Sequence, residues 1–159
     1  MRYNTEGGED LMRGRPIVSN AVTMDVNATY LTGAEAGKRV PVLVTVRFDP
    51  LDPVAITLRT RVPDQRVLAW TFARELLAEG DERPVGEGTI RIAPVLRERR
   101  RLLIVDLPSP GGPVTVELPA SRVADFVRRT YERVPASAES AVLDLDLDLD
   151  LGLAALDRG

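Results

Sequence analysis

Residues 70–80 read WTFARELLAEG, and this stretch decides the fold because it joins two kinds of structure. It contains the only tryptophan of the chain, and residues 73–79 are all good helix formers. Phe72 and Leu76 are four residues apart and would share one face of that helix. Gly80 stands where a left-handed residue commonly closes a helix. The stretch therefore predicts a strand that leads into a short helix, with the helix ending at Gly80.

Strand-like runs precede this helix, and the same order of elements follows it. The runs before it are AVTMDVNATYL (21–31), VPVLVTVRF (40–48), VAITLRTRV (54–62) and VLAW (67–70). Residues 84–88 contain Pro and Gly and predict a loop. The runs after it are GTIRIAPV (88–95), RRLLIVDL (100–107) and VTVEL (114–118), and PASRVADFVRRTYERV (119–134) has the apolar spacing of an amphipathic helix. This duplicated strands-then-helix plan predicts one α+β domain, with an antiparallel, barrel-like sheet and two helices on one side.

The two ends of the chain differ from this domain. Residues 1–17 are polar and without period, which predicts a disordered arm, so the domain is expected over residues 18–135. Residues 136–159 form an acidic Leu/Asp-rich tail with the repeat LDLDLDLDL. Its aspartates would lie about 7 Å apart on a strand, too far for one metal ion. We expect the tail to add an edge strand or to dock on a neighbour, because its leucines would otherwise be exposed.

The composition excludes several kinds of chemistry. The chain has no histidine and no cysteine, so Ser-His-Asp and Cys-His arrangements and thiolate metal sites cannot form. An enzyme would have to use Asp, Glu, Tyr, Ser or Lys38, and no serine lies in a nucleophile motif, so the composition argues against an enzyme. We predict no catalytic residue, no cofactor and no metal site. No apolar run approaches the ~20 residues of a membrane helix, and the N-terminal residues are polar. These features predict a cytoplasmic protein.

The pattern from residue 70 to residue 94 resembles the signature region of the SsgA-like proteins, which act in sporulation and cell division of mycelial actinobacteria. The matching residues are Trp70, Phe72, Ala73, Arg74, Glu75, Leu76, Leu77, Gly80, Pro84, Gly86, Gly88 and Pro94. The turn at residues 48–53 is also similar to that family, and the likeness covers about residues 19–150. Thr89 and Ala93 stand where members often carry Asp and Trp, which marks a divergent member.

The resemblance implies a fold and a function. The fold would be a β-barrel-like subunit of a bell-shaped trimer, similar to the whirly architecture of some single-stranded nucleic-acid-binding proteins. The function would be non-catalytic: members help to place or organise septa during sporulation, together with the tubulin-like division GTPase FtsZ and with other SsgA-like proteins. This implies a location at the division septum. Other members are tied to cell-wall remodelling, so a scaffold for that process is an alternative.

Two interpretations exist for the apolar part of the opening stretch, namely core packing or a partner-docking face. Core packing is favoured because large apolar side chains beside a helix start are usually buried; this concerns Trp70, Phe72, Leu76 and Leu77. Arg74 and Glu75 are predicted to point away from that face. They are the candidate partner-interface residues, with a surface ion pair as the alternative.

The densest basic cluster, RERRR at residues 97–101, suggests a further function. Its arginines could bind the backbone of a single-stranded nucleic acid; they are Arg97, Arg99, Arg100 and Arg101. The net charge of −3 and the aromatic content of 4% argue against this, because such proteins need a positive groove and stacking platforms. A solvated hairpin loop is the favoured interpretation.

Overall fold

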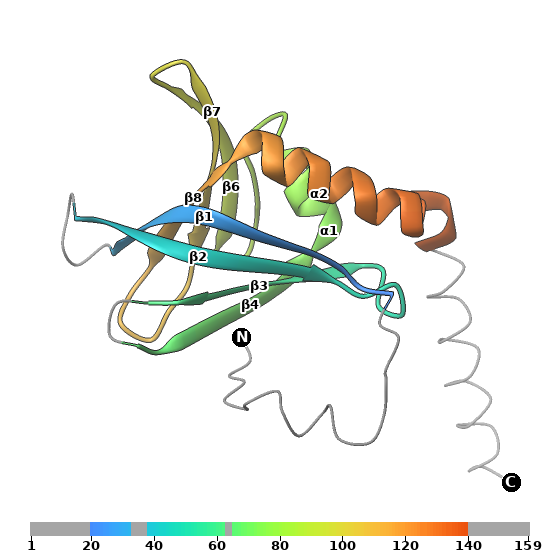
Figure 1. The fold of residues 1–159 in the computed structure, drawn as a ribbon, viewed down its shortest axis with the longest axis horizontal. Helices are drawn as coiled ribbons and strands as arrows, with labels where there is room; N and C mark the ends of the chain where they lie inside the picture. Colours follow the sequence, from blue (N-terminus) through green and yellow to red (C-terminus); the bar gives the residue numbers. More distant parts are fainter. Residues whose placement is uncertain (1–19, 33–37, 63–64, 140–159) are drawn as a thin grey trace, which may run out of the picture.

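The computed structural model describes residues 20–32, 38–62 and 65–139. These residues form one eight-stranded antiparallel sheet in the order β4-β3-β2-β1-β8-β7-β6-β5, together with two helices (Figure 1). In chain order the elements are β1 (Val22–Thr32), β2 (Arg39–Phe48), β3 (Ala55–Arg61), β4 (Val67–Ala73), α1 (Arg74–Gly80), β5 (Val85–Glu87), β6 (Ile90–Arg97), β7 (Arg100–Leu107), β8 (Val114–Pro119) and α2 (Ala120–Arg133). Four strands and a helix therefore occur twice, which confirms the duplicated plan.

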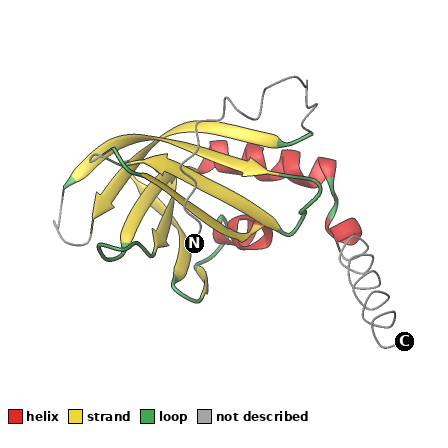
Figure 2. Ribbon diagram, turned by 90° about the horizontal axis from the view of Figure 1, so that it is seen from below, coloured by secondary structure: helices red, strands yellow, loops and turns green. Residues whose placement is uncertain are grey.

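Alternation along the strands builds the core. On β1 the residues predicted to share one face are all buried, namely Val22, Met24, Val26, Ala28 and Tyr30. The neighbouring strand β2 continues this inner face with Val44, Val46 and Phe48, each 0% exposed. Buried residues of both helices belong to the same core, including Leu77 of α1 and Phe126 of α2. Both helices therefore cover the inner face of the curled sheet (Figure 2).

The prediction of a loop over residues 84–88 was wrong. Val85–Glu87 form the edge strand β5, which pairs with β6 through Glu87 and Ile90. Gly88 has a φ of +61° and supplies the left-handed residue of the tight turn between them. The glycines that suggested a loop therefore belong to a β-hairpin.

Gly80 also departs from its predicted role. It is the last residue of α1 and its φ is not positive, so it is not a left-handed cap. A Cβ atom at this position would lie only 2.3 Å from Cγ2 of Ile92 on β6. A glycine is therefore required here because the helix approaches the sheet closely.

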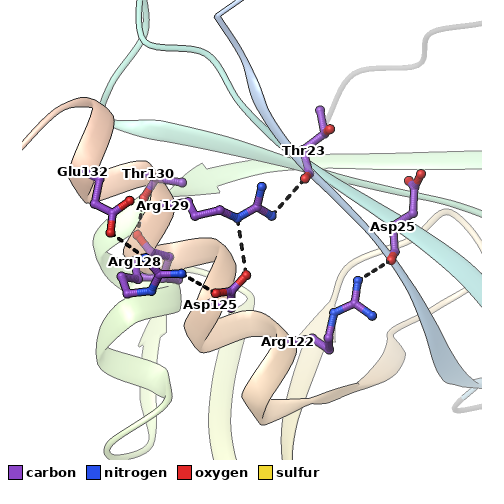
Figure 3. A network of polar contacts seen from close by, with 9 residues as sticks. Thr23, Asp25, Arg122, Asp125, Arg128, Arg129, Thr130 and Glu132 are labelled. Carbon is purple, nitrogen blue, oxygen red and sulfur yellow. Dashed lines mark hydrogen bonds and ion pairs between the residues drawn. The ribbon is translucent and has the colours of Figure 1, made fainter.

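Helix α2 fills a gap in the sheet. Strand β8 pairs with β1 only at Thr29–Thr32, so the first half of β1 lacks a strand on this side. Side chains of α2 donate hydrogen bonds to its carbonyl groups instead: Arg122 to Asp25 at 2.9 Å and Arg129 to Thr23 at 3.1 Å (Figure 3). The helix thus replaces the missing strand along this edge. No helix in the described part of the chain is long and apolar enough to cross a membrane.

Candidate functional site

The apolar residues of the opening stretch are buried, as core packing requires. Trp70 and Phe72 lie on β4 and point inward, while Leu76 and Leu77 lie on α1. The indole Nε1 of Trp70 donates a hydrogen bond of 2.7 Å to the carbonyl of Pro108, at the turn between β7 and β8. This hydrogen bond links β4, at one end of the sheet, to the β7–β8 turn in the second half of the chain. These side chains are consequently not available as a docking face.

Arg74 is the residue that the structure places most differently from the prediction. We expected its side chain to point away from the core, and this was wrong, because Arg74 is 0% exposed. The physical reason is its position directly after β4. Inward-facing residues on that strand are Leu68, Trp70 and Phe72, and residue 74 continues their two-residue alternation into the first turn of α1.

The guanidinium of Arg74 is held between two aromatic rings. Its Cζ lies 3.9 Å from the ring centroid of Tyr131 and 4.9 Å from that of Phe48. Arginine suits this place because its flat, weakly hydrated cation stacks on aromatic faces. Burial raises the pKa of the Tyr131 phenol, and the nearby charge of Arg74 acts in the opposite direction.

Polar contacts of Arg74 join three parts of the fold. Its Nη1 donates to the carbonyls of Thr130 (3.1 Å) and Val134 (2.7 Å), at the C-terminal end of α2. Its Nη2 donates to the carboxylate of Glu139 at 2.7 Å. A cation at this end of a helix also complements the helix dipole. The arginine therefore connects the β4–α1 corner, the end of α2 and the residues that follow it.

Glu75, the other predicted interface residue, is exposed. It lies in the first turn of α1 and forms no ion pair with another described residue. Of the two predicted interface residues, only Glu75 can thus present its charge to a partner. The inward alternation of β4 was the signal in the sequence that could have assigned Arg74 to the core.

The four arginines of the basic cluster lie at the β6–β7 hairpin. The two residues of its turn, Glu98 and Arg99, have φ values of 51° and 66°, as a two-residue hairpin turn with the twist of the strands requires. Arg97 forms an ion pair with Glu117 of β8 at 2.5 Å, and Arg101 forms one with Asp81 at 3.4 Å. Within the described chain, Arg99 and Arg100 form no ion pair.

Acidic residues of the described ranges do not gather into a metal site, since no group of three or more potential ligands was found among them. The aspartates of the predicted acidic tail lie outside the described residues; they are Asp144, Asp146, Asp148 and Asp150. The predicted arm at residues 1–17 lies outside them as well, so both ends of the predicted domain stay predictions.

These features define a single-domain α+β protein with a curled antiparallel sheet, two helices on its inner face and a basic hairpin at its edge. Residues 42–139 match the family model described as Streptomyces sporulation and cell division protein, SsgA. The chain belongs to this family, as the resemblance at residues 70–94 implied.

Relatives and solved structures agree with this assignment. The chain is 44% identical over 109 residues to the sporulation-specific cell division protein SsgB of Frankia casuarinae, covering 69% of this chain and 76% of that protein. It is 31% identical to SsgB of Streptomyces coelicolor, covering 80% and 92%. The crystal structure of an SsgA-like sporulation-specific cell division protein from Thermobifida fusca superposes with a TM-score of 0.72 at 31% identity, covering 87% of this chain and 99% of that one. The α+β fold is thereby confirmed.

Proposed function

We propose that this protein is a non-catalytic adaptor of sporulation-specific cell division, which helps to place or organise septa through contacts with other proteins. The observation that carries this proposal is membership of the SsgA family across residues 42–139, together with relatives named sporulation-specific cell division proteins. The division GTPase FtsZ and other SsgA-like proteins are the proposed partners, and the division septum is the proposed location. Self-association, as a trimer, belongs to the same proposal.

Glu75 is the proposed partner contact in the signature stretch. Its carboxylate is exposed, while the rigid corner beneath it is fixed by the buried Arg74. A charge held on a rigid element can contribute to partner selection, because opposite charges across an interface favour the correct partner and like charges disfavour the wrong one.

The test combines genetics with a binding assay in a sporulating actinobacterial host. Deletion of the gene is expected to reduce or misplace sporulation septa, and Glu75→Arg is expected to weaken co-purification with FtsZ or with another SsgA-like protein. Glu87→Arg is the matched control, because Glu87 is also exposed but lies on β5. Normal septation in the deletion strain would refute the proposed function. Equal partner recovery with both variants would refute the role of Glu75 alone.

A further inference from the structure

We propose that the surface beside the β6–β7 hairpin is a binding site for an extended acidic peptide of a protein partner, with a carboxylate and an aliphatic side chain two residues apart. The inference rests on the proposed adaptor function, and it names a surface and a chemical class of partner for it. We call this surface the arginine site, and define it by Arg39, Arg97, Arg100, Arg101, Leu102 and Pro119.

The arginine site consists of two adjoining hollows. The first has a volume of about 280 Å³ and the second about 300 Å³, and Arg100, Leu102 and Pro119 line both of them. Because the hollows share a wall, a ligand that spans this wall can fill both. Side chains two residues apart on an extended peptide point to the same side and are about 7 Å apart, which suits two adjacent hollows.

Three arginines in the lining of the first hollow can donate to a carboxylate; they are Arg39, Arg97 and Arg100. Glu117 is only 5% exposed, and each of its oxygens accepts a hydrogen bond from an arginine: one from Arg39 and the other from Arg97. These bonds position both guanidinium groups and occupy both oxygens of Glu117. A guanidinium carries five N–H donors, so both arginines keep donors for a ligand. Arg100 lines the same hollow and has no ion-pair partner among the described residues, which leaves its full charge for a ligand.

The second hollow is suited to an aliphatic side chain. Besides the shared Leu102 and Pro119, it is lined by Ala120 and Ala124 of α2. Leu96, which pairs with Arg101 across the hairpin, is 71% exposed. An exposed leucine beside charged residues provides apolar area that a partner can cover. Charge and apolar surface thus lie next to each other in the arginine site.

A peptide fits the arginine site better than a nucleic acid does. No aromatic residue lines either hollow, so bases would find no stacking platform among the lining residues. Glu98 also lines the first hollow, and its carboxylate disfavours a ligand with a negative charge at every unit more than a ligand that brings a single carboxylate. A single carboxylate can approach Arg100 while its neighbouring side chain enters the apolar hollow, and a phosphate chain cannot.

The experiment measures binding of a fluorescent peptide made of repeated Asp-Ser-Leu-Ser units to the full chain by fluorescence anisotropy. Two control peptides replace every Asp with Asn, or every Leu with Ser. Arg100→Gln is expected to weaken binding at least about tenfold, in line with the loss of a charge-assisted hydrogen bond. Arg59→Gln is the matched control, because Arg59 is exposed on β3 away from the hairpin. Circular dichroism melting checks that each variant is folded.

Selective binding of the Asp-Ser-Leu-Ser peptide, weakened by Arg100→Gln and not by Arg59→Gln, supports the proposal. Equal affinity for the Asn control, or no effect of Arg100→Gln, overturns it. Binding of a single-stranded oligonucleotide in place of the peptide, lost on Arg100→Gln, would overturn it in favour of the nucleic-acid alternative. A variant of the full chain with the four changes Asp144→Asn, Asp146→Asn, Asp148→Asn and Asp150→Asn is measured in parallel. Binding seen only with that variant would make the chain's own acidic segment the occupant, and would also overturn the proposal.

The septation assay separates this inference from the proposed function. If the peptide fails to bind while the deletion strain still lacks correct septa, the arginine site is refuted and the adaptor function stands. If the peptide binds as expected while septation is normal in the deletion strain, the adaptor function is refuted and the arginine site stands.

Discussion

At the scale of single residues, Arg74 shows how a family motif can combine packing and charge. Burying a cation is costly unless it is paired and fully hydrogen-bonded. Here Tyr131 stacks on the guanidinium, two carbonyls at the C-terminal end of α2 accept hydrogen bonds from Nη1, and Glu139 supplies the opposite charge beside Nη2. The buried Nε has no hydrogen-bond partner among the described residues, so part of that cost remains. Lysine cannot reproduce this, because it offers a point charge in place of a flat fork of donors. The motif therefore requires arginine for geometric reasons.

Removing Arg74 is expected to destabilise the fold strongly. Arg74→Ala leaves the carbonyls of Thr130 and Val134 and the carboxylate of Glu139 without their donor, and the expected loss in the free energy of unfolding is about 3–5 kcal/mol. Urea denaturation followed by circular dichroism measures it. Arg59→Ala, at an exposed position, should change the value little. A loss for Arg74→Ala no larger than that of Arg59→Ala would contradict the structural role of the arginine.

Tyr131 gives a dependence of stability on pH. Burial raises the pKa of its phenol above the usual 10.0, so the folded state favours the neutral form. Above pH 10.0 the unfolded chain loses this proton first, and stability is expected to fall as the pH rises from 10.0 towards the folded pKa. Tyr131→Phe keeps the ring over Arg74 and removes the proton. Urea midpoints at neutral and alkaline pH measure the loss of stability, and the variant should lose less than the original chain. An equal loss of stability in the two proteins would refute this prediction.

Gly80 offers a test of close packing. Gly80→Ala places a methyl group against Ile92, and overpacking of this kind costs about 1–3 kcal/mol. Because φ at Gly80 is not positive, the cost comes from the contact and not from backbone strain. The double variant with Ile92→Ala should be less destabilised than the sum of the two single variants. Melting temperatures of the four proteins measure this coupling, and simple additivity would show that the two residues are not in contact.

At the scale of elements, α2 acts as a substitute strand for the first half of β1. Its arginines donate to carbonyls at every second residue of β1, which is the spacing that a neighbouring strand would use. Arg128 points the other way and contacts Asp125 and Glu132 on its own helix (Figure 3). Its hydrogen bond lowers the pKa of Asp125. One face of the helix is therefore used for the sheet, and the other is internally paired.

Hydrogen exchange can detect this substitution. The double change Arg122→Ala and Arg129→Ala removes two donors from the edge of β1, and amides of residues 22–26 should exchange about five- to tenfold faster, as expected from losing roughly 1 kcal/mol of local protection. Arg128→Ala on the same helix is the control and should leave β1 unchanged. Equal exchange in both proteins would show that the arginines do not protect the strand.

Sequence patterns predicted the elements well where the signal was local. Two-residue alternation on β1 and β2 identified the inner face, and helical spacing identified α2. The short strand β5 was missed, because its glycines signal a turn as readily as a hairpin. The inward position of Arg74 was missed because Arg74 was treated as an ordinary helical position. In the structure it continues the two-residue alternation of β4. Contacts between distant residues, such as the pairs of Glu117 with Arg39 and Arg97, have no local signal at all.

At the scale of the whole molecule, the two halves of the duplicated plan share one core. Strand β1 of the first half pairs with β8 of the second half, and Trp70 on β4 donates to Pro108. Arg74 adds a second connection, because it belongs to the first half and its partners on α2 belong to the second. Neither half can therefore bury its own apolar face without the other.

This shared core predicts a single cooperative unfolding transition. Trp70 is the only tryptophan, so its fluorescence reports on the junction between the halves, while far-ultraviolet circular dichroism reports on all strands and helices. The two signals should change at the same urea concentration, as in a two-state domain. Trp70 is 1% exposed, and its emission should shift to the red only when the core opens. If the fluorescence changed at a lower urea concentration than the dichroism, the halves would unfold separately, and the duplicated plan would describe two units in place of one domain.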